Sequence, residues 1–337
     1  MEFTIGGRLE VRMTPADVGK RVSVRRVVDA SEAGAKFTDT VGVLTSWDNG
    51  VLSITPKNGE TVRIAESSLV AGKVVPAAPA RRRGPAASSD ELAHVTARAW
   101  QPVESEPLGD WQLRAAGGFT RRANSVLPLG DPGMPLGEAL RRVRQWYGER
   151  GLPAYVQTST GGEGTQERLC ADLEECGWRR EVSAEVRIAA LAPLGDRDAD
   201  VRAVRTARTA DEAWLSRYRR FGAPGHTPGA HVLKVLGSGP SVWFATVPGD
   251  SPGQAPAAIG RCVVDGRWAG FMAVEVGPEY RRRGLATAVM TALARKALQE
   301  GASAAWLQAE TDNEGALALY DGMGFAVHHR YHHFRSA

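Results

Sequence analysis

The segment Arg281 to Ala286 has the residue types and spacing best suited to chemistry in this chain. It reads Arg-Arg-Arg-Gly-Leu-Ala. An apolar run at 271–276 precedes it, and residues 287–298 have the composition of a helix. A strand, a tight glycine turn and a helix start leave several backbone N–H groups unpaired near one point, where the helix dipole adds positive potential. Gly284 lets the backbone approach a ligand closely. The segment therefore predicts a phosphate-binding loop, with a solvated arginine run ahead of a surface helix as the alternative.

A second motif follows the apolar run at 304–309. Residues 313–325 read Asn-Glu-Gly-Ala-Leu-Ala-Leu-Tyr-Asp-Gly-Met-Gly-Phe. The two motifs resemble those of the GNAT superfamily of N-acetyltransferases, whose phosphate loop reads Arg/Gln-x-x-Gly-x-Gly/Ala and whose second motif reads Asn-x-x-Ala-x-x-Leu-Tyr-x-x-x-Gly-Phe. The matching positions of this chain are Arg281, Gly284, Ala286, Asn313, Ala316, Leu319, Tyr320, Gly324 and Phe325. The resemblance extends over roughly residues 200–337.

The resemblance implies a mixed α+β fold of the GNAT type and acetyl-CoA as the donor. The pyrophosphate of the cofactor would lie on the loop amides, and its pantetheine arm would lie beside the strand that ends at Val276. The arginine side chains of the loop can also steer a negatively charged cofactor. The residues expected at the cofactor are Val274, Val276, Arg281, Arg282, Arg283, Gly284, Leu285, Ala286, Thr287, Asn313 and Ala316. Asn313 is also expected to cap a helix at 314–322.

Two residues are the candidates for proton transfer. The resemblance places Tyr320 beside the cofactor sulfur, and a phenol with a pKa of about 10 stays protonated at neutral pH, as a general acid requires; the alternative is a core aromatic on the inner face of its helix. Glu275 is the candidate base, directly or through water, if alternation turns it toward the acceptor cleft; otherwise it is an exposed or paired carboxylate. Glu310 is a further candidate, either orienting an amine or capping locally.

Four histidines near the end of the chain could suggest a metal site: His328, His329, His332 and His333. On a strand, His328 and His332 point one way and the other two point the opposite way. No carboxylate or cysteine with ligand spacing accompanies them. We therefore expect strand surface and cleft wall here, and no metal.

The composition is that of an ordinary globular protein, with 337 residues, 43% hydrophobic and 24% charged, and a net charge of +4. Arginine dominates the basic residues, which permits nucleic-acid contact without requiring it. The three cysteines, Cys170, Cys176 and Cys262, form no Cys-x-x-Cys pair and fit a reducing cytoplasm. No targeting segment is recognisable, and no run reaches the roughly 18–20 apolar residues of a membrane span. We expect a cytoplasmic protein.

The chain is expected to begin with a small all-β barrel over residues 1–75. Strand candidates lie at 21–28, 40–47, 51–55 and 61–64, and Asp48-Asn49-Gly50 is a hairpin signal. The pattern is similar to the Src-homology-3-like modules found ahead of some actinobacterial GNAT proteins. Residues 76–90 are rich in Pro, Ala and Ser, which predicts a flexible linker whose Arg81–Arg83 triplet is solvated or contacts an acidic partner.

Residues 91–195 are interpreted as a degenerate GNAT-like copy ahead of the catalytic GNAT domain at 196–337, as in the tandem type of this family. The order of helix, glycine, strand, helix and Gly-aromatic pair occurs in both, ending at Gly177-Trp178 and at Gly324-Phe325. Leu173 stands where Tyr320 is found, and prolines in 127–133 remove donors that a phosphate cradle needs. We therefore expect a catalytically silent copy, whose segment 117–125 either packs the copies together or contacts substrate.

The leading hypothesis is an N-acetyltransferase that moves the acetyl group of acetyl-CoA to a primary amine by direct attack. The acceptor could be a small molecule, an amino acid or a protein amine. The alternatives are a non-catalytic acyl-CoA-binding regulatory protein and a nucleic-acid-associated acetyltransferase. The last would use the barrel as reader, where Arg21, Arg25, Arg26 and Trp47 offer basic charge but few aromatics. The sequence specifies neither the acceptor nor the oligomeric state.

Overall fold

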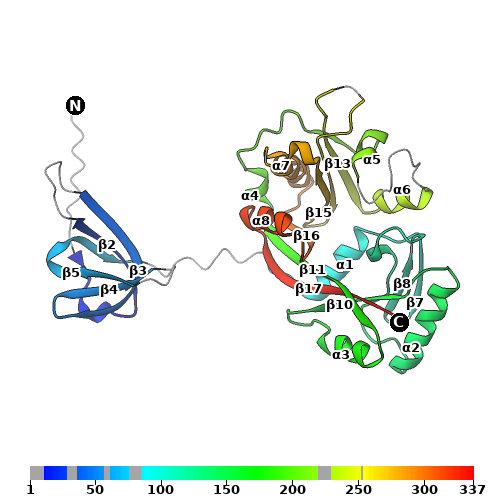
Figure 1. Cartoon of the computed structure of the whole chain (residues 1–337), viewed down its shortest axis with the longest axis horizontal. Helices are drawn as coiled ribbons and strands as arrows, with labels where there is room; N and C mark the ends of the chain where they lie inside the picture. The colour runs from blue at the N-terminus through cyan, green and yellow to red at the C-terminus, as the bar shows by residue number, and fades with distance from the viewer. Residues whose placement is uncertain (1–10, 29–35, 57–60, 76–84, 219–228, 252) are drawn as a thin grey trace. The chain divides into compact units, whose positions relative to one another are not determined.

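The computed structural model describes residues 11–28, 36–56, 61–75, 85–218, 229–251 and 253–337. The chain divides into two compact units, Met1–Arg83 and Gly84–Ala337 (Figure 1). No helix in the described part of the chain has both the length and the apolar composition that crossing a bilayer requires. The turn expected at Lys57–Glu60 and the Arg81–Arg83 triplet lie outside the described residues.

The first unit is one six-stranded sheet in the order β1-β6-β2-β3-β4-β5. Its strands are β1 (Val11–Arg12), β2 (Arg21–Val28), β3 (Lys36–Asp48), β4 (Val51–Thr55), β5 (Val62–Ala65) and β6 (Leu69–Val74). The expected hairpin is confirmed, because Asp48 pairs with Val51 and both intervening residues, Asn49 and Gly50, have positive φ. The core is formed by alternate residues of the strands, among them Val22, Val24, Leu44, Leu52, Ile54 and Ile64.

The expected linker at 76–90 is wrong at its end, because residues 85–90 already belong to the second unit. Ser88 caps helix α1 (Ser89–Arg98) by accepting from the Glu91 N–H at 3.0 Å. The carbonyl of Ala86 accepts from Arg267 at 2.7 Å. A stretch of Pro, Ala and Ser has no apolar face, but here it is tied to distant residues: the Ala86 carbonyl accepts from Arg267, and the Ser89 hydroxyl donates to the Glu163 carbonyl.

The second unit is built on an eight-stranded sheet in the order β10-β17-β11-β16-β15-β14-β13-β12, beside a three-stranded sheet β7-β8-β9. The strands are β7 (Glu104–Leu108), β8 (Trp111–Ala115), β9 (Leu127–Pro128), β10 (Tyr155–Thr160), β11 (Arg179–Ala190), β12 (Arg205–Ala207), β13 (Ser241–Val247), β14 (Ala258–Asp265), β15 (Trp268–Val276), β16 (Ala304–Glu310) and β17 (Ala326–Arg335). The helices after α1 are α2 (Leu136–Gly148), α3 (Glu167–Glu175), α4 (Ala192–Gly195), α5 (Glu212–Arg217), α6 (Ala230–Leu236), α7 (Leu285–Gln299) and α8 (Glu314–Gly322).

The second unit repeats one order of elements. The run β9-α2-β10-α3-β11 corresponds to β15-α7-β16-α8-β17, and in each the first two strands meet in parallel. The last strands are exchanged between the two runs, because β11 pairs with β16 and β17 pairs with β10. In Figure 1, β11 and β17 run side by side through the middle of the unit, as their antiparallel pairing requires. The division expected at residue 195 therefore separates no compact units.

The parallel pair β15 and β16 meets in tight packing. Gly270 on β15 pairs with Trp306 on β16, whose side chain is fully buried. A Cβ atom at position 270 would lie 2.3 Å from the indole ring of Trp306, closer than real contacts allow. A glycine at this position lets the indole fill the core directly beneath the strand junction.

We predict that Gly270→Ala lowers the free energy of unfolding by about 1–3 kcal/mol, the usual cost of overpacking a core. Gly137→Ala is the matched control, because Gly137 is exposed on α2 and a Cβ there meets nothing within 4 Å. The control should be neutral or stabilising by up to about 1 kcal/mol. Urea unfolding of the three proteins measures both effects, and equal stability of Gly270→Ala and wild type would contradict the packing argument.

Candidate active site

A cleft opens where β15 and β16 stop pairing. Their parallel pairing runs only from Trp268–Ala304 to Phe271–Leu307, although β15 continues to Val276 and β16 to Glu310. Strand β15 stays on β14 through a bulge at Ala273, whose φ is 52°. The divergence leaves a cleft of about 1230 Å³, bordered by both strands, the start of α7 and helix α8.

The turn ahead of α7 presents a row of free backbone donors. The N–H groups of residues 282–287 have no hydrogen-bond acceptor within the described part of the chain. The first bonded N–H is that of Ala288, which donates to the Gly284 carbonyl at 3.0 Å. Arg282 and Gly284 have φ values of 62° and 76°, so the chain turns sharply and its N–H groups converge at the helix start. Such a row, together with the helix dipole, forms an anion site.

Most residues expected at the cofactor border this one cleft. They are Val274, Val276, Arg281, Arg282, Gly284, Leu285, Ala286, Thr287, Asn313 and Ala316. The side chain of Arg283 is not among the cleft-lining groups; its guanidinium lies 5.4 Å from the ring centroid of Tyr280, and only its backbone N–H belongs to the donor row. The capping role of Asn313 is confirmed, since its side-chain oxygen accepts from the Ala316 N–H at 3.2 Å.

Tyr320 combines the two environments that the sequence left as alternatives. Its ring packs edge-on against Phe325 at 5.9 Å, next to the core under the sheet. Its side chain also borders the cleft, and its hydroxyl has no hydrogen-bond partner among the described residues. Burial raises the pKa of Tyr320 to about 12, although the positive charge of Arg187 opposes this. The phenol is therefore protonated throughout the physiological range.

Two carboxylates border the same cleft. Glu275 and Glu310 are half-buried at the ends of β15 and β16, and each interacts with a neighbouring group. Both Val274 and Val276 also border the cleft, so alternation does not separate Glu275 from its neighbours. The reason is the bulge at Ala273 and the loss of β16 as a partner, which expose this end of β15 along its edge.

The cleft also includes residues that sequence reasoning did not assign to the site. Thr120, Arg121 and Arg122 come from the segment 117–125 and form part of its wall. Strand β17 contributes Tyr331 and His333. Two sequence signals bore on these positions: the unusual composition of residues 117–125, and the pattern that puts His329 and His333 on one face of the last strand.

The four histidines have separate environments. His332 is bonded by both ring nitrogens, to Thr160 Oγ1 at 2.8 Å and to Ser183 Oγ at 2.7 Å. His328 and His329 contact each other through their Nδ1 atoms at 2.8 Å. His333 is 2% exposed, and neither of its ring nitrogens has a partner in the described residues. Across the described ranges, no group of three His, Cys, Asp or Glu side chains could hold a metal ion.

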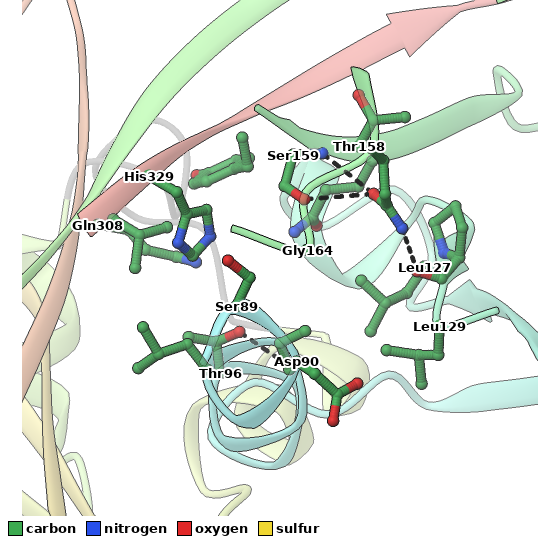
Figure 2. A pocket seen from close by; sticks show the side chains of 17 residues that line it. Ser89, Asp90, Thr96, Leu127, Leu129, Thr158, Ser159, Gly164, Gln308 and His329 are labelled. Carbon is green, nitrogen blue, oxygen red and sulfur yellow. Dashed lines mark hydrogen bonds between the residues drawn. The ribbon is translucent and has the colours of Figure 1, made fainter. Parts of the chain in front are cut away.

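The first run of elements has a counterpart of the cleft that is nearly closed. Val126 and Val156 form a single parallel bridge, after which β9 and β10 separate around a pocket of about 100 Å³. The side chain of Gln166 spans this gap: its Nε2 donates to the Pro128 carbonyl at 2.7 Å, and its Oε1 accepts from the Ser159 N–H at 3.1 Å. Figure 2 shows these bonds between the strand segments around Leu127 and Ser159.

The loop ahead of α2 presents no comparable row of donors. The N–H groups of Leu129 and Asp131 donate to Asp110, and that of Gly133 donates to the Asp131 side chain at 2.6 Å. Pro132 and Pro135 have no N–H to offer. The loop thus bonds three of its N–H groups and is interrupted by two prolines, whereas residues 282–287 form an unbroken row of free N–H groups.

Three features occur together: the parallel strands β15 and β16 diverge, a row of free N–H groups precedes α7, and a protonated tyrosine, Tyr320, lies on α8. This combination defines an acyltransferase of the GNAT type. The fold is shared with solved GNAT structures. A GCN5-related N-acetyltransferase from Kribbella flavida matches 74% of this chain and 95% of its own at a TM-score of 0.54 and 15% identity. A tandem GNAT protein from the clavulanic acid biosynthesis pathway matches 77% of this chain and 90% of its own, at a TM-score of 0.52 and 13% identity.

Sequence comparison gives the family. Residues 87–334 match the family described as "Probable histone acetyltransferase Rv0428c C-terminal", and the chain belongs to this family. The probable histone acetyltransferase Rv0428c of Mycobacterium tuberculosis is 29% identical over 320 residues, covering 93% of each chain. The uncharacterized N-acetyltransferase YobR of Bacillus subtilis is 23% identical over 251 residues, covering 72% of this chain and 96% of its own. The protein is thus an acetyltransferase with the GNAT fold.

The buried histidines predict that stability falls in mild acid. Burial lowers the pKa of His329 and His332 to about 4 and that of His333 well below 6.5. The unfolded chain binds these protons near pH 6.5, so the stabilisation is complete above about pH 6.5 and is lost as the pH falls toward 4. Each residue contributes a slope of at most about 1.4 kcal/mol per pH unit.

Urea unfolding between pH 7.5 and pH 5 measures this slope. The variant His332→Asn removes one titrating ring beside Thr160 and Ser183. The slope of its unfolding free energy against pH should therefore correspond to about one proton fewer than in the wild type. An unchanged slope in that variant would contradict a neutral, buried His332.

Proposed function

We propose that the protein transfers the acetyl group of acetyl-CoA to a primary amine. The single observation that carries the proposal is the row of free N–H groups at residues 282–287, which opens onto the same cleft as the Tyr320 hydroxyl. Binding of a diphosphate would satisfy donors that the protein leaves unpaired. Arg281 and Arg282 border the cleft and add positive charge beside this row.

The divergence of the strands supports the path of the cofactor. Beyond Phe271, the edge of β15 that faces β16 has no strand partner in the described pairing. The amide groups of a pantetheine arm would replace those lost partners, as an added strand does. With the pyrophosphate beyond the end of β15, the arm would run back along β15, and its thioester would lie toward the junction of the strands.

The chemistry requires a neutral amine and a proton donor for the leaving group. The amine nitrogen attacks the thioester carbonyl carbon, the C–S bond breaks, and the coenzyme leaves as a thiol that receives its proton from Tyr320. The amine proton passes to Glu275, directly or through water, and the phenol is restored from solvent. Fixing both reactants in the cleft makes the step unimolecular.

One acyl-CoA should bind per chain. In the first run of elements, the amide of Gln166 makes the bonds to Pro128 and Ser159 that a cofactor amide would otherwise make, and the adjoining loop has no free donor row. We therefore assign the donor site to the second run alone and treat the first as scaffold and acceptor-side wall.

A pair of glycine variants tests this assignment. Gly284 and Gly133 have φ values of 76° and 74°, so alanine costs about 1–2 kcal/mol of backbone strain at either position. At position 284 the shift also misplaces charge-assisted donors, each worth about 1.5–3 kcal/mol, so acyl-CoA should bind at least about tenfold more weakly. Gly133→Ala should leave binding unchanged.

Titration calorimetry should give one acetyl-CoA per wild-type chain, with the affinity lost only in Gly284→Ala. Two molecules per chain, or equal losses in the two variants, would place a donor site in the first run and remove the assignment.

Tyr320→Phe tests the chemical step. Loss of the general acid should lower kcat by about 10²–10⁴, while acetyl-CoA binding is retained because the hydroxyl has no structural partner. Since the pKa is raised to about 12, the wild-type rate should not decline up to about pH 10. Thiol release over an amine panel provides the rate, and an unchanged kcat in Tyr320→Phe would exclude this role. Binding without any thiol release would instead favour a non-catalytic acyl-CoA sensor.

A further inference from the structure

One wall of the cleft lies next to positive charge that no acid balances. Arg114 and Arg261 are buried, at 3% and 0% exposure, and both lie close enough to Arg122 for their charges to interact. Arg114 donates to Ser125 and to the Gln157 side chain, and Arg261 donates to main-chain carbonyls. Neither forms an ion pair with a carboxylate in the described part of the chain. Buried charges without counter-ions leave a positive potential that favours an anion nearby.

Arg122 adds a third positive charge, and its side chain borders the cleft. Its guanidinium lies 4.8 Å from the ring centroid of Trp100, and Arg261 lies 5.0 Å from the same centroid. One of its nitrogens donates to Gln308 Oε1 at 2.7 Å, just past the point where β16 leaves β15. Arg121, in contrast, lies 3.6 Å from Glu181. Among the described residues, Arg122 has no carboxylate partner, so a planar fork of donors faces the cleft with its charge unbalanced.

His333, in the same wall of the cleft, has unsatisfied hydrogen-bonding groups. Its two ring nitrogens are buried without partners among the described residues, which destabilises the fold unless a ligand or water bonds them. Burial, with the charges of Arg114, Arg121 and Arg122, lowers its pKa well below the ordinary value. A neutral imidazole can bond either a donor or an acceptor of a ligand.

We infer that the acceptor is a small amino acid-like molecule, which carries a carboxylate as well as the amine, and that Arg122 binds this carboxylate with His333 beside it. The inference rests on the proposed acetyl transfer. The pyrophosphate has its own donors beyond the far end of β15, whereas Arg122 lies at the junction toward which the thioester points. A carboxylate bound there holds the acceptor at the reacting end of the cleft, and the amine remains free to attack.

The alternative acceptor is a lysine in a basic protein tail, which the printed name of the M. tuberculosis relative suggests. The carboxylates of Glu275, Glu310, Asp312 and Glu314 border other parts of the cleft and attract cations, but at the wall formed by Arg122, with Arg114 and Arg261 near it, the further cations of such a tail are repelled. The wall therefore favours acceptors with a negative group and disfavours lysine-rich peptides.

The test is a comparison of matched acceptors. Acetyl-CoA turnover is measured with the standard amino acids, with their methyl esters, and with a lysine-rich peptide. The wild type should prefer the free acid of its best acceptor over the ester by about tenfold to a hundredfold in kcat/KM, because a hydrogen bond to a charged group contributes about that much. The lysine-rich peptide should be the poorer substrate.

Arg122→Gln should abolish the preference for the acid by raising its KM, with the ester and the acetyl-CoA dissociation constant little changed. Arg122→Lys should restore part of it, since charge returns without the planar fork. Equal rates for acid and ester in the wild type, or an equal fall in kcat for both in Arg122→Gln, would overturn the inference while leaving acetyl transfer intact. Absence of turnover with every amine would overturn both.

Discussion

The site depends on one constraint, the point at which β15 and β16 cease to pair. A parallel strand that loses its neighbour exposes backbone donors and acceptors, which must find other partners. Strand β15 keeps its second neighbour, β14, through the bulge at Ala273, so it stays rigid while its other edge is free. The cleft follows from this separation, and the donor row at 282–287 and helix α8 border it. A ligand with amide groups can bond the free edge of β15, and phosphate groups on the same ligand can bond the N–H row at 282–287.

The two runs of elements show how small a change closes such a cleft. Both have a parallel contact followed by separation, but in the first the side chain of Gln166 joins the separated strands. Two prolines interrupt the loop that corresponds to the donor row, and Asp110, from the turn between β7 and β8, accepts hydrogen bonds from its N–H groups. The same backbone path thus gives a binding cleft in one half and a small polar pocket in the other (Figure 2).

The sequence predicted the local features that depend on short-range chemistry. Asn313 as a cap, the Asn49-Gly50 hairpin and the mixed α+β fold of the GNAT type are confirmed, because each is encoded within a few residues or by a specific motif. The expected contact of Arg283 with the cofactor stays a prediction: its backbone N–H belongs to the donor row, while its guanidinium lies over Tyr280, and a run of three arginines does not specify which side chain borders a cleft. The sequence singled out segment 117–125 as either packing or substrate-contacting, but it could not show that Arg122 lies in the cleft wall, because this position arises when segments far apart in the chain meet across the sheet.

The exchange of β11 and β17 also has a consequence for biosynthesis. Phe334 of β17 is fully buried in the core formed by α2, α3 and β8, so that core is incomplete until the last strand arrives. A nascent chain that has emerged only through β11 presents an unfilled apolar surface and an unpaired strand edge. We therefore expect this core to close only after Phe334 has been synthesised, and until then the exposed apolar surface is of the kind that chaperones bind.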